Sequence, residues 1–204
     1  MYRPRAFAVD DTKELHAFMR AHPFATLAAV VDGAVQFAYA PVVTNGGMAR
    51  FHLARANKLA ALADGTRLRL SFLGANAYVS PDWYESAAMV PTWNYSVVEG
   101  EGVSRRLNED ELRALLVDLS AAEENKLLPK KPWTVDKVPP ERMTGLLQAI
   151  VGFEVRLETL EGKFKLSQDK KPEDFAGVLR ALGDRGDAAS LAVAAAMRGA
   201  ARNS

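Results

Sequence analysis

Short apolar runs and glycine turns alternate along the first third of the chain. The run from Phe24 to Val31 is apolar almost throughout and is followed by Asp32-Gly33, a strong hairpin signal. We therefore predict a return strand from Val35 to Pro41 and, after the turn at Asn45-Gly46-Gly47, a third strand from Met48 to Leu53. Three strands joined by tight turns predict an antiparallel meander.

Period-two alternation marks the next strand. From Arg67 to Phe72 a polar residue alternates with an apolar one, so Leu68, Leu70 and Phe72 are expected to face a core. Further strands are predicted at residues 77–80, 95–103 and 149–157. Six or so strands joined by tight turns predict a small closed barrel, because closure removes exposed strand edges.

Helical spacing precedes and follows these strands. Helices are predicted at residues 10–22 and 57–63, and Asn108 with Glu111 forms a capping-box pattern ahead of an amphipathic helix. The proline- and lysine-rich stretch 126–142 is expected to be a mobile loop or lid.

The chain as a whole is predicted to form one α+β domain over residues 1–204. Its centre is a mainly antiparallel β-barrel with peripheral helices. A helical elaboration is expected at about 106–147, and C-terminal helices at about 172–202.

The composition narrows the classes of function. A net charge of +1 gives no electrostatic argument for binding nucleic acid or an anionic membrane. The chain contains no cysteine, which excludes disulfides, thiolate catalysis and cysteine-bound metals. No apolar stretch approaches the roughly 20 residues that cross a bilayer, and no apolar leader is present at the N-terminus. We therefore expect a cytoplasmic protein.

Several hydrogen-bond donors gather where a predicted strand ends and a helix begins. They are His52, Arg55, Asn57 and Lys58. Phosphate recognition needs fixed backbone donors or cations at such a junction, and the helix would add the positive end of its dipole. The alternative is a solvated turn with ordinary surface cations. No glycine-rich loop of the P-loop or dinucleotide-binding type is present.

A second cluster combines aromatic, proline and small polar residues over 77–84 and 90–95. Such a mixture lines a pocket for a planar polar ligand or forms an interface, because both need apolar area with fixed donors. Candidate side chains are Tyr78, Ser80, Trp83, Thr92, Trp93, Asn94 and Tyr95. The alternative is a loop whose aromatic residues cap a core.

Three runs of residues resemble one family in particular. They are His52–Asn57, the aromatic cluster ending in Thr92-Trp93-Asn94, and Gly162–Gln168, and with the first helix they extend the likeness to about Leu182. The chain is similar to the PaiB family of FMN-binding split-barrel proteins, described as negative transcriptional regulators, and to the wider pyridoxamine-phosphate-oxidase-like split barrel. Residues 37–41 and 86–89 depart from the family pattern.

The resemblance implies a split barrel that binds FMN at the interface of a homodimer. It implies that Arg55, Asn57 and Lys58 hold the FMN phosphate and that His52 lines the site. The isoalloxazine ring would lie against Tyr78, Ser80, Thr92, Trp93 and Asn94. Haem, with His52 and His22 as axial ligands, is a less favoured alternative. Lys163 and Lys165, near Ser167 and Gln168, would face a phosphate or an acidic partner, or would only protect a strand edge.

Two functions follow from the resemblance. The first is an FMN-binding negative transcriptional regulator, for which direct DNA contact rests on the family alone, since no helix-turn-helix with a basic recognition helix is evident. The second is a flavin-dependent oxidoreductase acting on a small molecule. No side chain stands out as a general acid or base, so the catalytic residues of such an enzyme stay unassigned.

Overall fold

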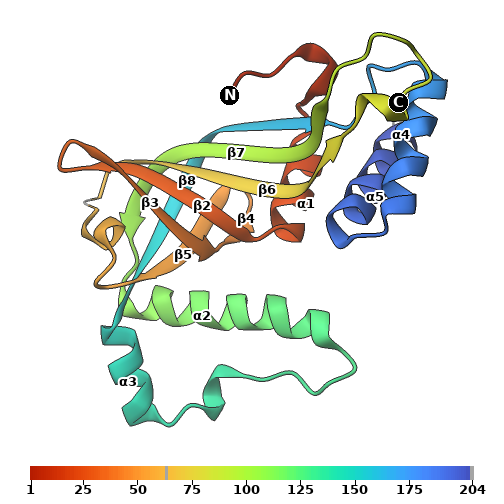
Figure 1. The fold of residues 1–204 in the computed structure, drawn as a ribbon. Coiled ribbons are helices and arrows are strands. Elements are labelled where there is room, and N and C mark those ends of the chain that lie inside the picture. Colours follow the sequence, from red (N-terminus) through yellow and green to blue (C-terminus); the bar gives the residue numbers. More distant parts are fainter. Residues whose placement is uncertain (63, 203–204) are drawn as a thin grey trace. The chain divides into compact units, whose positions relative to one another are not determined.

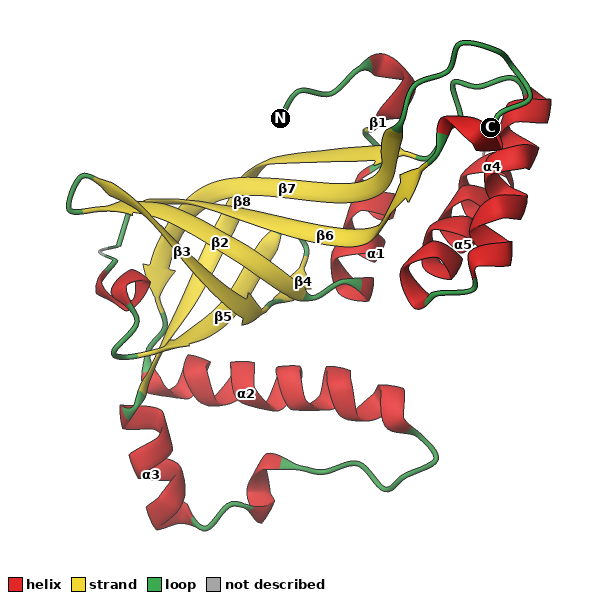
Figure 2. Ribbon diagram, in the orientation of Figure 1, coloured by secondary structure: helices red, strands yellow, loops and turns green. Residues whose placement is uncertain are grey.

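The computed structural model describes residues 1–62 and 64–202, and its centre is one mainly antiparallel sheet of eight strands (Figures 1 and 2). The strand order is β3-β2-β6-β7-β8-β5-β4, and β1 pairs with β8. The strands are β1 (Ala8–Val9), β2 (Phe24–Val31), β3 (Ala34–Pro41), β4 (Val43–Asn45), β5 (Met48–Ala54), β6 (Arg67–Val79), β7 (Thr92–Arg106) and β8 (Ile150–Lys165).

Helices account for most of the remaining chain. The α-helices are α1 (Thr12–Ala21), α2 (Glu109–Glu124), α3 (Pro140–Gln148), α4 (Pro172–Arg185) and α5 (Ala188–Arg202). The short 3-10 helices are η1 (Arg5–Phe7), η2 (Lys58–Ala61), η3 (Pro81–Trp83), η4 (Asn125–Leu127) and η5 (Val135–Lys137).

The β2–β3 hairpin confirms the turn predicted from sequence. Asp32 and Gly33 both adopt positive φ, at 51° and 75°, as a tight two-residue hairpin turn requires. The predicted meander is wrong for its third strand, because β5 pairs with β8 and β4 and not with β3. Phe51 of β5 lies opposite Phe153 of β8 with the ring centroids 5.6 Å apart, so an aromatic pair distant in sequence fixes this neighbour.

The order of strands also corrects the expectation of a closed barrel. Among the described residues, β3 and β4 stand at the two ends of the hydrogen-bonded path, so the sheet is open. The split barrel implied by the family resemblance describes it better. The alternation predicted for 67–72 is confirmed, since Leu68, Leu70 and Phe72 are fully buried. The strand itself runs seven residues further than that pattern, to Val79.

The chain forms two compact units. Unit 1 consists of Met1–Leu15, Leu73–Val98 and Glu161–Ser204, and unit 2 of His16–Phe72 and Glu99–Leu160. The strands β6, β7 and β8 contribute residues to both units. One domain over the whole chain therefore remains a prediction.

In unit 2, α2 and α3 share a small core made of Leu112, Leu115, Met143 and Leu147. The capping box is confirmed: Asn108 accepts from the Glu111 amide, and Glu111 accepts from the Asn108 amide, each at 2.9 Å. The predicted lid at 126–142 instead contains η5 and the start of α3. It packs through Val135 and Val138 against the same core, and its mobility stays a prediction.

In unit 1, α4 and α5 lie side by side and cover an apolar core (Figure 1). The fully buried side chains of this core include Val79, Val178, Leu182, Val193 and Met197. A Cβ atom at Gly177 of α4 would lie 2.2 Å from the backbone carbonyl oxygen of Trp83. Only glycine allows α4 to approach η3 this closely.

The helix predicted at 57–63 is the four-residue 3-10 helix η2. Its last predicted residue, Ala63, lies outside the described residues. So short a turn has little dipole, which corrects the expectation that a helix N-terminus would add to a phosphate site here.

Candidate functional site

His52 lies on β5, one of the strands of unit 2, opposite Gly152 of β8. Its ring is half-buried, and its Nδ1 atom is buried without a hydrogen-bond partner. Burial lowers the pKa of His52, so the imidazole is neutral at neutral pH. Because Nδ1 is enclosed, only Nε2 is left to meet a ligand.

The other predicted phosphate ligands follow β5. Arg55 donates through Nε to the Gln148 carbonyl at 2.6 Å and through Nη2 to the Ile150 carbonyl at 3.0 Å. Its guanidinium thereby stabilises the C-terminus of α3 and leaves Nη1 for another acceptor. Asn57 caps η2 by accepting from the Leu59 amide at 2.9 Å. Lys58 is exposed and forms no ion pair with any residue that the structure describes.

The predicted ring-binding residues lie in unit 1. Tyr78 of β6 and Trp93 of β7 make an edge contact, with their centroids 6.3 Å apart, and are 38% and 53% exposed. This outward-facing pair offers an apolar wall to a planar ligand. Ser80 has a local role, since it caps η3 by accepting from the Asp82 amide at 3.3 Å.

Asn94 does not share a surface with Trp93, because successive strand residues point to opposite faces. It is 1% exposed and donates to Ser167 Oγ at 2.9 Å and to Met197 Sδ at 3.6 Å. The amide therefore fixes the turn after β8, where Ser167 has a φ of 64°. The predicted set thus divides into an exposed aromatic pair and a buried polar cluster.

The buried cluster borders a cavity of about 250 Å³ within unit 1. Its lining consists of Phe7, Tyr84, Met89, Val90, Thr92, Asn94, Lys165, Ser167, Asp169 and Lys170. The Lys165 ammonium donates to Thr92 Oγ1 and, at 2.9 Å, to the Trp93 carbonyl. Burial lowers the pKa of Lys165 and raises the pKa of Tyr84, whose phenol is hydrogen-bonded with Ser167.

This cavity joins two of the family-like runs, at 92–94 and 162–168, that are about 70 residues apart. Lys163 belongs to the second run, is 9% exposed, and places its Nζ 5.3 Å from the ring centroids of both Tyr2 and Tyr95. Sequence reasoning singled out both lysines but found no partner for them. Only the pairing of strands shows where they lie.

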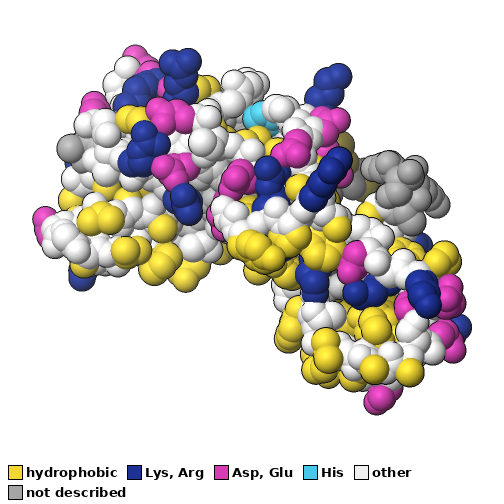
Figure 3. Space-filling model, turned by 90° about the horizontal axis from the view of Figure 1, so that it is seen from above, with side chains coloured by type: hydrophobic (Ala, Val, Ile, Leu, Met, Phe, Trp, Pro, Cys, Tyr) yellow, Lys and Arg dark blue, Asp and Glu magenta, His cyan; other side chains and the backbone are white. Residues whose placement is uncertain are grey.

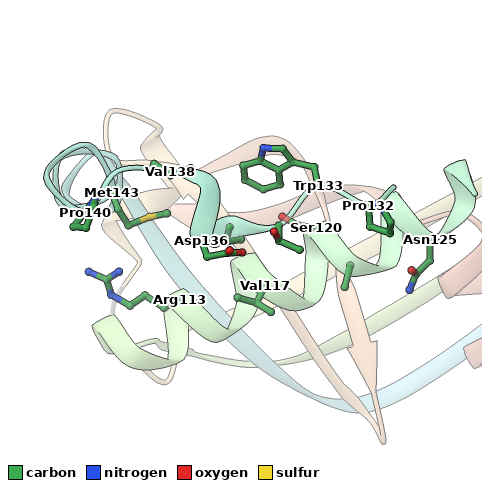
Figure 4. Close-up of a pocket in the computed structure, with 13 residues that line it drawn as sticks. Arg113, Val117, Ser120, Asn125, Pro132, Trp133, Asp136, Val138, Pro140 and Met143 are labelled. Carbon is green, nitrogen blue, oxygen red and sulfur yellow. The ribbon is translucent and has the colours of Figure 1, made fainter. Parts of the chain in front are cut away.

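A second cavity, of about 670 Å³, lies in unit 2 between α2 and the segment 132–143 (Figure 4). Val117 and Trp133 give it a mainly apolar wall, and Asp136 and Ser120 are among its few polar groups. The Glu124 carboxylate secures the segment by accepting from the Trp133 amide at 2.7 Å. The cavity suits an apolar molecule more than a phosphate, and it contains none of the predicted site residues.

The β2–β3 hairpin of unit 2 carries an apolar face exposed to solvent. Val35, Phe37 and Tyr39 alternate along β3 and are 60%, 62% and 65% exposed. Val30 and Thr26 of β2 lie opposite Val35 and Tyr39 on this face. Figure 3 shows hydrophobic side chains, in yellow, gathered along the lower left edge of the molecule. Such a contiguous patch is typical of an interface.

The described part of the chain lacks a membrane-spanning helix and a cluster of metal ligands. None of its helices is long and apolar enough to cross a membrane. It also contains no group of three or more histidine, aspartate or glutamate side chains placed to hold a metal ion.

The open antiparallel sheet and its helices define a protein of the split-barrel fold. The chain belongs to the family described as "Putative FMN-binding domain", whose model matches residues 1–159. This confirms the family resemblance found in the sequence.

Two relatives extend the comparison. The "Protease synthase and sporulation protein PAI 2" of Bacillus subtilis is 29% identical over 188 residues, which cover 89% of each chain. An uncharacterized protein of Aspergillus fumigatus is 32% identical over 135 residues, which cover 57% of this chain and 52% of the relative.

Solved structures show the same fold at low sequence identity. An FAD and haem binding protein from Mycobacterium smegmatis matches 83% of this chain and 78% of its own, with a TM-score of 0.60 and 18% identity. The flavocytochrome Anf3 from Azotobacter vinelandii matches 83% of this chain and 75% of its own, with a TM-score of 0.55 and 16% identity.

Proposed function

We propose that this protein is an FMN-binding, homodimeric negative transcriptional regulator of the PaiB type, located in the cytoplasm. The observation that carries the proposal is membership of the FMN-binding family over residues 1–159. The name of the Bacillus subtilis relative, a protease synthase and sporulation protein, supports a regulatory role. A net charge of +1 offers DNA little attraction, so a salt-sensitive gel shift with the promoter of its own gene tests direct contact.

The side chains of each unit, taken separately, suit the chemistry of one part of FMN. Lys58 and the free Nη1 edge of Arg55 provide exposed cations for the phosphate dianion. Tyr78 and Trp93 provide an apolar wall for the isoalloxazine ring. Bound FMN would supply redox chemistry, and the protein would orient it and set its electrostatic surroundings. Ser80 and Asn94 form hydrogen bonds within the protein, to Asp82 and Ser167. In the proposal they hold the neighbouring backbone in place and do not contact FMN themselves.

The homodimer rests on the apolar face of the β2–β3 hairpin. A standard interface buries about 800 Å² per partner, which needs a contiguous and mainly apolar centre. The exposed aromatic residues Phe37 and Tyr39 suit such a centre, and a second copy would cover both of them through a two-fold axis.

A titration with FMN, followed by flavin fluorescence and visible absorbance, tests the cofactor site. Lys58→Ala should weaken binding by about 1.5–3 kcal/mol, or roughly 10- to 150-fold, because it removes a charged donor to the phosphate. Lys13→Ala, which removes an exposed cation from α1, is the matched control and should leave the affinity unchanged. Equal affinity in the wild type and Lys58→Ala would contradict the phosphate assignment.

A flavin-dependent oxidoreductase is the second candidate, and the cavity beside Lys165 and Tyr84 favours it. Both side chains hold a proton that can move, and the cavity has the volume of a small molecule. Reduction of bound FMN by NADH, followed by reoxidation by an acceptor, would support the enzyme. Haem remains the alternative cofactor, and a Soret band that His52→Ala abolishes would support it.

A further inference from the structure

Lys163 and Lys165 are two ammonium groups two positions apart on β8, and both are partly shielded from water. Lys163 is 9% exposed and Lys165 is half-buried. Neither has a carboxylate within ion-pair distance among the residues that the structure describes. Lys165 donates only to the uncharged oxygens of Thr92 and Trp93. A partly desolvated charge without an ion-pair partner gains from a nearby anion, so the site beside Lys165 suits an anionic ligand.

Two side chains beside the cavity, Lys165 and Thr92, can donate hydrogen bonds to a ligand. An ammonium carries three N–H groups, and two of those on Lys165 are used within the protein. Thr92 accepts from Lys165, which leaves its own hydroxyl proton free to donate to a ligand. The one carboxylate in the lining, Asp169, is neutralised by Lys170 at 2.7 Å. The remaining unpaired charge in the lining is therefore the Lys165 cation.

We propose that this cavity binds the oxyanion group of a small molecule, a carboxylate or a phosphate, with Lys165 as its counter-charge and Thr92 as a second donor. This site goes beyond the proposed function, because its residues differ from Arg55 and Lys58, the proposed ligands of the FMN phosphate.

The shape of the cavity limits the ligand. A volume of about 250 Å³ falls below the roughly 300–1,000 Å³ of sites for drug-sized molecules. Phe7, Met89 and Val90 contribute apolar side chains to the lining, and Lys165 and Thr92 contribute polar ones. A short aliphatic or aromatic acid has both the apolar group and the charged group that this lining suits.

The turn that follows Lys165 in the cavity lining is held in place by a buried hydrogen bond. Ser167 adopts a left-handed backbone conformation with a φ of 64°, which costs energy for a residue other than glycine. The buried amide of Asn94 bonds its hydroxyl and holds the turn that follows Lys165. Asn94 is thus a positioning residue for the anion site.

Calorimetric titration of the full-length protein with benzoate and, separately, inorganic phosphate tests the proposal. We expect saturable 1:1 binding of at least one probe, weakened at least tenfold in Lys165→Met. Lys171→Met, which removes an exposed cation outside the cavity lining, is the matched control, and its affinity should change less than threefold. Binding of neither probe, or equal binding in Lys165→Met, would overturn the proposal.

FMN affinity separates this site from the cofactor site. Lys165→Met should bind FMN normally, and Lys58→Ala should bind benzoate normally, so each proposal can fail without the other. If Lys165→Met also loses FMN and phosphate competes with FMN, the site is supported and its occupant is the flavin phosphate.

Chemical modification of the wild type keeps the test independent of folding in the variant. The half-buried Lys165 amine deprotonates more readily than an ordinary lysine, since burial lowers its pKa. Acetylation by N-hydroxysuccinimide acetate, read by peptide mass spectrometry, should be slowed at least threefold at Lys165 by saturating benzoate. It should be unchanged at the exposed Lys171. Equal labelling of Lys165 with and without benzoate would overturn the proposal.

Discussion

Gly177 and Gly183 provide a matched pair of substitutions on α4. Glycine in a helix interior costs about 1 kcal/mol relative to alanine, so alanine at an unobstructed position stabilises the fold. A Cβ atom at Gly183 would meet nothing within 4 Å, whereas one at Gly177 would lie 2.2 Å from the Trp83 carbonyl oxygen. The two glycines share a helix, and only Gly177 faces a backbone atom at this distance.

The expected effects have opposite signs. Gly183→Ala should stabilise the protein by about 0.5–1 kcal/mol, which raises Tm by roughly 1–4 °C in a chain of this size. Gly177→Ala gains the same propensity term, but overpacking costs typically 1–3 kcal/mol, and here a rigid backbone atom must move. We expect a net loss of about 2 kcal/mol, or roughly 4–8 °C in Tm.

Thermal unfolding followed by circular dichroism, together with urea titration, measures both variants. The urea m-value should stay constant, since neither change alters the surface exposed on unfolding. If Gly177→Ala proves as stable as Gly183→Ala, the close approach of α4 to η3 is not a constraint on the fold.

Three further outcomes are expected. Asn94→Leu should lower the free energy of unfolding in urea by about 1–3 kcal/mol, because Ser167 Oγ loses its buried partner; unchanged stability would refute this role. The Arg105 ion pair holds the pKa of Glu111 below its ordinary 4.5, so its stabilisation is present above that pH and lost as pH falls through the folded value. In Glu111→Gln, the free energy of unfolding should therefore fall less steeply as the pH is lowered below 4.5. Parallel plots of unfolding free energy against pH for the two proteins would contradict this role of Glu111. Phe37→Lys should yield a monomer by light scattering at micromolar concentration, and a persisting dimer would place the interface elsewhere.

Local patterns predicted the local structure well. The Asp32-Gly33 turn and the Asn108–Glu111 capping box depend on neighbouring residues, and both occur where expected. The partner of β5 depends on Phe51 meeting Phe153, about 100 residues later, and no local rule selects it. The start of α3 did carry a local signal, because Pro140 occupies a first-turn position that proline favours.

The candidate site residues stay a prediction. The sequence proposed them as a set, but it did not show which of them lie close to one another. Arg55 binds carbonyls more than 90 positions away, and Thr92 meets Lys165 across 73 positions. Side chains alternate between the two faces along β7, so Trp93 and Asn94 lie on opposite faces. This separation could have been predicted from the sequence once residues 92–95 were assigned to a strand.

The stretch Glu161–Ser204 has a consequence for how this protein can diverge. It supplies Lys165, Ser167 and the α4–α5 pair to unit 1, yet the matched family region ends at residue 159. The similarity to the Bacillus subtilis relative covers 89% of this chain and so extends past residue 159, into the stretch that carries Lys165 and Ser167. Sequence changes in this stretch would alter the proposed anion site and leave the matched region at 1–159 unchanged.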